Sequence, residues 1–241
     1  MEVYIKRGYV ERRAQIGKWA SLLGLVVLGG GFLISLRNPG LFIISFGTLI
    51  LGFLLSNVGI YYANRYARPD RPDAVLAQAL KGFDKRYALY QFLFPASHVL
   101  REPSGLTVLI PKPQEGRIVY AGGKWRNKQG WSRLLRWVGQ EGLGKPGAEA
   151  QTEAATMHDW LQRQAPELDV PIRGLVVFTN AKAELDLDDP PVTVLAPKQL
   201  KGWLRKAGKL PPLSQEVQAQ LAEVMNEAAQ VGSARVEDEE E

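Results

Sequence analysis

The residues of this chain whose types and spacing could do chemistry gather in a basic, tryptophan-bearing stretch from Lys112 to Trp137. Its one carboxylate is Glu115. Its cations and interleaved tryptophans are Lys112, Arg117, Lys124, Trp125, Arg126, Lys128, Trp131, Arg133, Arg136 and Trp137. Cations beside aromatic rings are typical of surfaces that bind phosphate groups, either in nucleic acid or in anionic lipids at a bilayer.

Three interpretations of this stretch remain open: contact with anionic lipid head groups, a solvated basic face over core tryptophans, and nucleic-acid binding. The lipid surface is the leading one, because the stretch follows a segment that we expect to be anchored in a membrane. The candidate contact residues are Lys124, Arg126, Lys128, Trp131, Arg133 and Arg136.

Other chemistry finds little support in the composition. The 241 residues include no cysteine, which excludes disulfides and thiolate metal sites. The two histidines, His98 and His158, fall on different expected elements and do not form a histidine metal cage. The glycines between Gly139 and Gly144 have neither the strand–loop–helix context nor the Lys-Ser/Thr ending of a phosphate-binding loop. We therefore expect no metal and no cofactor.

Two apolar runs precede these residues, from Trp19 to Leu36 and from Leu41 to Tyr62, and neither contains a charge. At ~1.5 Å per residue they span roughly 27 and 33 Å, close to the ~30 Å hydrocarbon core of a bilayer. The turn sequence from Arg37 to Gly40 lets the chain reverse between them. Residues 19–64 are thus predicted to form a two-helix transmembrane hairpin, which serves as an anchor because neither span contains a charged residue for transport.

The basic flanks of the hairpin predict its orientation. The cations outside the turn are Lys6, Arg7, Arg12, Arg13, Lys18, Arg65, Arg68 and Arg71. Because cytoplasmic flanks carry an excess of Lys and Arg, both termini are expected in the cytoplasm, with Arg37 alone on the other side. The prediction is a multi-pass protein of a bacterial-type cytoplasmic (inner) membrane, with residues 1–18 as a basic cytoplasmic segment.

Small residues make both helices smooth. The glycines are Gly24, Gly29, Gly30, Gly31, Gly47 and Gly52, and Gly52 and Ser56 have small-xxx-small spacing. Such residues let helix backbones approach closely. Close packing within the hairpin is the leading interpretation, and a contact face for a membrane-protein partner is the alternative.

The remaining sequence predicts one mixed α/β domain. After a polar linker at 65–73, Asp73 is a plausible N-cap for a helix that reaches about Tyr90. The expected strands are His98–Leu100, Leu106–Ile110 and Arg117–Tyr120, as a three-stranded meander, then Leu175–Phe178 and Val192–Leu195 after an acidic loop at 186–189. The expected helices are Ala148–Gln164, Pro197–Lys206 and Leu213–Val231. This gives an α/β domain at 74–206, a C-terminal helix at 207–231 and an acidic disordered tail at 232–241.

Part of this domain resembles the nuclease-related domain (NERD) family, a distant relative of the restriction-endonuclease-like nucleases. The resemblance runs from about Asp73 to Leu204. Its residues are Ser97-His98-Val99-Leu100, Pro103-Ser104-Gly105, Leu109-Ile110-Pro111-Lys112, Gly116, Trp125, Pro146 with Glu149, and Val176-Val177-Phe178. It implies a restriction-endonuclease-like fold in which Lys112 stands at the position of the catalytic lysine.

The family's acidic positions are changed in this chain. Ser97 stands where the family has an aspartate, Ile110 where it has a glutamate, and Glu149 where it has a glutamine. A magnesium site needs carboxylates, so the resemblance implies a motif remnant at Lys112 without catalytic residues. We expect a binding or scaffolding module. A nuclease with replacement ligands (Glu102, Glu115 or Asp84) and an accessory subunit of a larger membrane complex are the alternatives.

Overall fold

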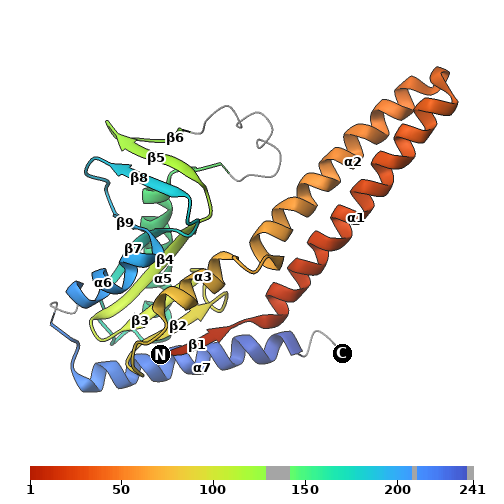
Figure 1. Cartoon of the computed structure of the whole chain (residues 1–241). Coiled ribbons are helices and arrows are strands. Elements are labelled where there is room, and N and C mark those ends of the chain that lie inside the picture. The colour runs from red at the N-terminus through yellow and green to blue at the C-terminus, as the bar shows by residue number, and fades with distance from the viewer. Residues whose placement is uncertain (129–141, 208–210, 238–241) are drawn as a thin grey trace. The chain divides into compact units, whose positions relative to one another are not determined.

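The computed structural model describes residues 1–128, 142–207 and 211–237, and these form two compact units (Figure 1). One unit is a helical hairpin, Arg7–Arg71. The other is an α/β unit made of Met1–Lys6 and the described residues from Pro72 onward. The α/β unit is therefore discontinuous in sequence, because the hairpin is inserted after its first strand.

The hairpin consists of two long helices joined by a tight turn. Its elements are α1 (Arg7–Arg37), the 3-10 turn η1 (Pro39–Leu41), α2 (Phe42–Tyr62) and the π-helical turn η2 (Ala63–Ala67). Both helices are long and apolar enough to cross a membrane. In the most apolar segment of each helix only 11% of the residues are buried, whereas the core helix of a soluble domain is mostly buried. Helix α1 begins at Arg7, well before the apolar run at Trp19.

Small residues spaced seven apart line the contact between the two helices. The buried residues at this spacing are Gly17, Gly24 and Gly31 on α1 and Ser45, Gly52 and Gly59 on α2. A Cβ atom on Gly24 would lie 2.7 Å from the backbone nitrogen of Ser56 and 3.0 Å from the carbonyl oxygen of Gly52. The backbones thus approach as closely as glycine allows, which confirms the close packing within the hairpin.

Three of the predicted interface glycines take no part in this contact. Added Cβ atoms at Gly29, Gly30 and Gly47 would meet nothing within 4 Å. The contact with a membrane-protein partner stays a prediction.

The α/β unit is built around a six-stranded mixed sheet. Its strands are β1 (Glu2–Ile5), β2 (Ala88–Gln91), β3 (His98–Glu102), β4 (Gly105–Lys112), β7 (Ile172–Phe178) and β9 (Thr193–Leu195), hydrogen-bonded in that order. Strands β2, β3 and β4 form an antiparallel meander, β1 is parallel to β2, and β7 runs parallel to both β4 and β9. The two edges of the sheet are β1 and β9.

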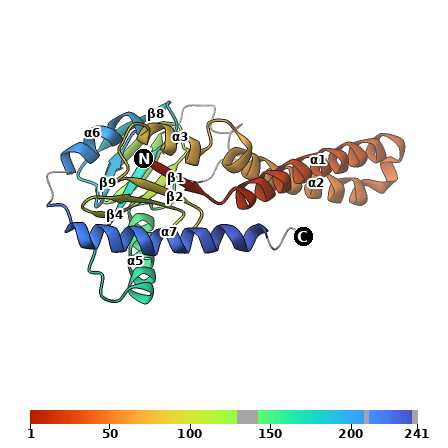
Figure 2. The same cartoon turned by 90° about the horizontal axis from the view of Figure 1, so that it is seen from below.

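Helices cover both faces of this sheet (Figure 2). They are α3 (Pro72–Leu80) and α6 (Pro197–Ala207) on one face, and α5 (Pro146–Gln164) and α7 (Gln215–Glu237) on the other. Because strand side chains alternate, Leu100 and Leu109 pack with Leu76 on the α3 side, while Val99 and Val108 belong to the core that holds Met157 of α5. The expectation of a mixed α/β domain after two long apolar helices is thus confirmed.

A second sheet of three strands is not hydrogen-bonded to the first. Its strands are β5 (Gly116–Ala121), β6 (Lys124–Lys128) and β8 (Ala183–Leu187). Strand β5 lies in the middle, antiparallel to β6 and parallel to β8. The prediction that Arg117–Tyr120 completes a meander with the two preceding strands is therefore wrong. The expected acidic loop begins later than predicted, because Asp186 lies on β8.

The segment before the meander also differs from the prediction. Helix α3 ends at Leu80, since Gly82 takes a left-handed φ of 99° that a continuing helix does not allow. The predicted helix to Tyr90 is wrong, and its last residues form β2. Asp73 is not the N-cap, because it lies inside the first turn of α3 and is buried.

The two ends of the described chain extend the predicted elements. Strand β1 comes from the first residues of the segment that was expected to be only a basic flank. Helix α7 runs to Glu237, beyond the expected end at Val231, and residues 238–241 lie outside the described residues.

Candidate functional site

Lys112 lies at the carboxyl end of β4, beside the end of β7. Its register partner is Phe178, and the next backbone N–H, that of Thr179, donates to the Lys112 carbonyl oxygen at 2.8 Å. Alternation along β4 puts Lys112 on the same face as Ile110 and Val108, the face covered by α5. Two adjacent parallel strands thus direct this one lysine toward the first turn of α5.

The ammonium group of Lys112 meets a carboxylate there. Its Nζ donates to Oε2 of Glu149 at 2.6 Å, and the lysine side chain is 9% exposed against 41% for the glutamate. Gly144, in the loop before α5, has a φ of 65°, and a Cβ on it would lie 2.6 Å from Oε1 of Glu149. A residue with a Cβ atom would be strained at this φ and would crowd the Glu149 carboxylate, so glycine lets the loop pass close to the ion pair.

The other two motif positions lie next to this pair. The β3–β4 register pairs Val99 with Val108, and continuing it by two residues puts Ser97 opposite Ile110. Ile110 is 4% exposed and belongs to the apolar core. The structure therefore brings together the four positions that the family resemblance singled out: Ser97, Ile110, Lys112 and Glu149.

Glu153 is a member of this site that the sequence analysis missed. The backbone N–H of Ser97 donates to Oε2 of Glu153 at 3.4 Å. The carbonyl oxygen of Ser97 accepts from the backbone N–H of Phe92 at 2.7 Å. Glu149 and Glu153 are four residues apart on α5 and so share one face of the helix. That spacing is the signal in the sequence that could have identified Glu153.

The chemistry of this arrangement is that of a paired cation rather than of a metal centre. Within the described ranges, no three His, Asp or Glu side chains are grouped closely enough to hold a metal ion. Lys112 would itself repel a divalent cation, and its charge is already matched by Glu149. The geometry suits a structural tie between β4 and α5.

Among the described residues, the three proposed replacement ligands form no cluster that could hold a metal ion. Glu102 pairs with Gly105 at the other end of β4, about 23 Å of strand from Lys112. Its carboxylate is buried and accepts from Arg173 and Thr107, each at 2.6 Å.

Asp84 and Glu115 have other neighbours. Asp84 lies 2.6 Å from the guanidinium of Arg86, whose hydrogen bonds lower the pKa of that carboxyl. Glu115 follows the end of β4, and its carbonyl oxygen accepts from the side-chain amide of Asn127 at 3.2 Å. The alternative of a rearranged metal site gains no geometric support among the described residues.

The basic stretch is divided by the structure. Lys124, Arg126 and Lys128 lie on β6 with exposed side chains. Trp125, between them, faces the other way and packs on Tyr120, with ring centroids 4.8 Å apart. Three of the predicted contact residues, Trp131, Arg133 and Arg136, lie outside the described residues.

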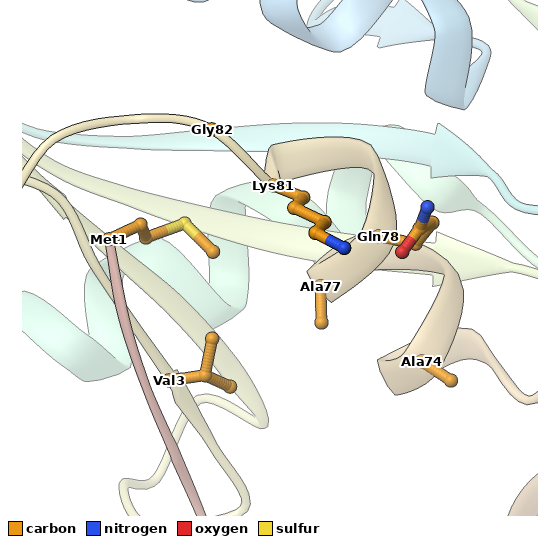
Figure 3. Close-up of a pocket in the computed structure, with 7 residues that line it drawn as sticks. All are labelled: Met1, Val3, Ala74, Ala77, Gln78, Lys81 and Gly82. Atoms are coloured by element: carbon orange, nitrogen blue, oxygen red, sulfur yellow. The ribbon is translucent and has the colours of Figure 1, made fainter.

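A pocket of about 430 Å³ lies elsewhere in the α/β unit, between the N-terminal residues and helix α3 (Figure 3). It is lined by Met1, Val3, Ala74, Ala77, Gln78, Lys81 and Gly82. Among its seven lining residues Lys81 has the one ionisable side chain, and none has a carboxylate, hydroxyl or imidazole that could act with it as an acid–base partner.

Comparisons of the chain with protein-family models, with curated proteins and with solved structures give no match. The interpretation of the site therefore depends on its own geometry.

Proposed function

We propose that this protein is a membrane-anchored, nuclease-related domain that does not cleave nucleic acid and acts as a binding or scaffolding module at the cytoplasmic face. The observation that carries the proposal is the Lys112–Glu149 ion pair beside Ile110. The residue that the nuclease-related resemblance equates with a catalytic lysine is already bound to a carboxylate of its own chain.

The missing ligands explain why catalysis is not expected. Mg²⁺ in such a site is held by carboxylate oxygens and lowers the barrier by stabilising charge on the phosphate. Ser97 offers at most a neutral hydroxyl, and Ile110 offers no ligand and packs in the core. Moving a carboxylate into the place of Ile110 would require opening that core, which costs several kcal/mol, on the order of a buried large-to-small change.

The hairpin supports the anchored part of the proposal. Helices α1 and α2 expose large apolar side chains over most of their length, and a bilayer removes that surface from water. Their basic flanks favour the orientation in which both ends of the hairpin are cytoplasmic. In that arrangement the α/β unit, whose chain enters and leaves the hairpin at the same end, is cytoplasmic as well.

The test is a cleavage assay on the full chain purified in detergent. Plasmid, single-stranded DNA and RNA are incubated with Mg²⁺ and with Mn²⁺, beside the Lys112→Ala variant. We expect no cleavage by either protein with either metal. Cleavage that disappears in Lys112→Ala would overturn the proposal and favour the metal-dependent nuclease, whereas cleavage that survives the substitution comes from a contaminant.

A further inference from the structure

Strand β6 presents three cations in a row on one side. Exposed and half-buried residues alternate along it, so that Lys124, Arg126 and Lys128 share the solvent side. Residues two apart on a strand are about 7 Å from each other. In the part of the chain that the structure describes, none of the three has an ion-pair partner. We name these three residues the β6 basic column.

The rest of this face of the small sheet is different in character. On the central strand, Arg117 is the register partner of Lys128, and its guanidinium is held by Asp186 of β8 at 2.7 Å. Glu184 is the next exposed residue on β8. Acidic side chains thus lie at the β8 edge and neutralise the central arginine, while the β6 basic column at the opposite edge keeps its full positive charge.

The one aromatic residue of β6, Trp125, faces away from the basic column. Trp125 faces the opposite side of the sheet, where it packs on Tyr120 and contacts the apolar core. The exposed residues of this face are Arg117, Ala121, Lys124, Arg126, Lys128, Glu184 and Asp186, none of which is aromatic. Proteins that bind single-stranded nucleic acid stack the bases on exposed rings, so this face has the cations of such a surface without its stacking platforms.

We propose that the β6 basic column docks on the phosphate groups of anionic lipids in the bilayer that holds α1 and α2. This inference rests on the membrane anchor of the proposed function. Lysine and arginine near an anionic membrane surface each contribute attraction that salt screens within a Debye length. Charge complementarity supports this docking, since three cations that have no ion-pair partner among the described residues lie on an edge strand and match a plane of phosphates.

The short connections between the hairpin and the α/β unit also support this docking. Strand β1 ends at Ile5 and helix α1 begins at Arg7, while η2 ends at Ala67 and α3 begins at Pro72. Both connections between the hairpin and the α/β unit are therefore only a few residues long. Short linkers hold a domain at a local concentration on the order of millimolar, so that even a weak surface attraction becomes occupied.

A competing explanation of the column is protection of the sheet edge. Exposed lysines on an edge strand discourage pairing with the edge of another molecule. That role needs charge of either sign and is independent of the lipid. Reversing the three charges therefore distinguishes the two explanations, because an edge of three glutamates still resists pairing but no longer attracts phosphate.

The experiment uses the full chain reconstituted into vesicles. Because the protein has no cysteine, Ala121→Cys provides a single labelling position, exposed and opposite Lys124 across the β5–β6 pair. A donor dye there reports energy transfer to acceptor dyes on lipid head groups. We expect higher transfer in vesicles with phosphatidylglycerol than in phosphatidylcholine alone, and a fall to the neutral level in about 1 M salt, where the Debye length is ~3 Å.

The variants Lys124→Glu, Arg126→Glu and Lys128→Glu, combined in one chain, should abolish the difference between the two lipids. The corresponding triple glutamine variant should lower the docked-to-undocked ratio by roughly two orders of magnitude, since it removes three charges without reversing them. The matched control reverses Lys198, Arg205 and Lys206, three exposed cations of identical composition around α6, and should keep the response to anionic lipid.

Equal transfer in both lipids for the unchanged column would overturn the inference, as would an equal loss in the α6 control. Binding of a labelled oligonucleotide by the column, with no response to anionic lipid, would replace it with nucleic-acid binding. The same vesicles also test the anchor, because an integral protein resists alkaline extraction. Resistance without a lipid response refutes the column alone, whereas extraction of the protein refutes the proposed anchor and this inference with it.

Discussion

The Nζ atom of Lys112, at the end of β4, lies 2.6 Å from Oε2 of Glu149, in the first turn of α5. The two residues are far apart in sequence and join the central meander to the helix that covers one of its faces. The lysine is nearly buried, whereas the glutamate reaches solvent on one side. The pair therefore contributes to stability mostly because the nearly buried lysine charge would have no counter-charge without Glu149.

Substitution of Glu149 by glutamine should lower the free energy of unfolding of the α/β unit by about 1–2 kcal/mol. The figure is kept at the low end because Glu149 is partly exposed, and water screens its charge. Lys112→Met should cost less than Glu149→Gln, because it removes the buried charge instead of isolating it. Denaturant unfolding of the detergent-solubilised chain, followed by tryptophan fluorescence, measures both.

The exposed pair Arg117–Asp186 provides the control. Its side chains are 57% and 53% exposed, and Asp186→Asn should change stability by less than about 0.5 kcal/mol. The double variant Lys112→Met with Glu149→Gln should recover part of the Glu149→Gln loss. If the two single losses simply added, the pair would not be a unit and this account of the site would fail.

The hairpin makes a separate prediction about its glycines. Gly24→Ala places a methyl group within 3.0 Å of backbone atoms of α2, which cannot move aside as a side chain can. It should therefore destabilise the hairpin by about 1–3 kcal/mol, the usual cost of overpacking. Gly30→Ala meets nothing within 4 Å and should be neutral or slightly stabilising, because alanine favours helix.

Thermal denaturation of both variants in detergent, followed by circular dichroism, compares the two positions directly. Equal melting temperatures would contradict the close contact of α1 and α2 through small residues spaced seven apart. A loss at Gly30 alone would point instead to a helix contact on the outer face.

The elements that depend on local pattern could be predicted from the sequence. Two long apolar runs and the turn between them fix the hairpin, and α5 and β7 follow from periodicity and β-branched residues. The pairing of β3 with β4 follows from the short turn between them. The full order of the strands could not be predicted, because it is decided by contacts between distant segments. Strand β5 looks like the third strand of a meander, but its neighbours are β6 and β8, and Gly116 lies beside Ala183 across the sheet.

Competing local signals explain the error before the meander. Leu76, Leu80, Phe83 and Tyr87 continue one helical face, which favoured a helix to Tyr90. Gly82 was the opposing signal, since a glycine after the last apolar turn commonly ends a helix in the left-handed conformation.

The candidate site shows the same division between local and distant information. The sequence predicted a strand that ends at Ile110, but β4 continues through Pro111 to Lys112. The predicted helix from Ala148 put Glu149 in its first turn, and α5 confirms that position. That the two side chains pair could not be seen, because their distance depends on how α5 packs on β4. Strand β6 was not predicted either, because Lys124–Lys128 contains no run of apolar residues.

The proposed orientation of the hairpin predicts accessibility from each side of the membrane. A single cysteine at Asn38, in the turn, should react with a membrane-impermeant maleimide added to intact cells. A cysteine at Gly122, in the β5–β6 turn of the α/β unit, should react only after the membrane is opened. A reporter fused after Glu241 should likewise read cytoplasmic. Labelling of Gly122→Cys in intact cells would refute the orientation.

The buried hydrogen bond of Tyr90 to α7 predicts how the stability of the α/β unit changes at alkaline pH. Its phenol donates to Oδ1 of Asn226 on α7 at 2.6 Å, and burial raises its pKa above 10.0. The folded state therefore holds the proton more tightly than the unfolded chain. The stabilisation is complete below pH 10, the ordinary pKa of tyrosine, and is lost as the pH rises through the folded value.

Tyr90→Phe removes both the hydrogen bond and this titration. At pH ~7 it should cost about 1 kcal/mol, the net value of one hydrogen bond, and the difference from the parent chain should shrink above pH ~10. Urea unfolding of the two proteins at matched pH values measures that difference, and the titration of lysines common to both cancels. A difference that grows with pH would mean that the phenolate is favoured in the folded state, and the direction assigned to the Tyr90 pKa would be wrong. A constant difference would mean that the Tyr90 pKa is the same in the folded and the unfolded chain, which also contradicts the assigned direction.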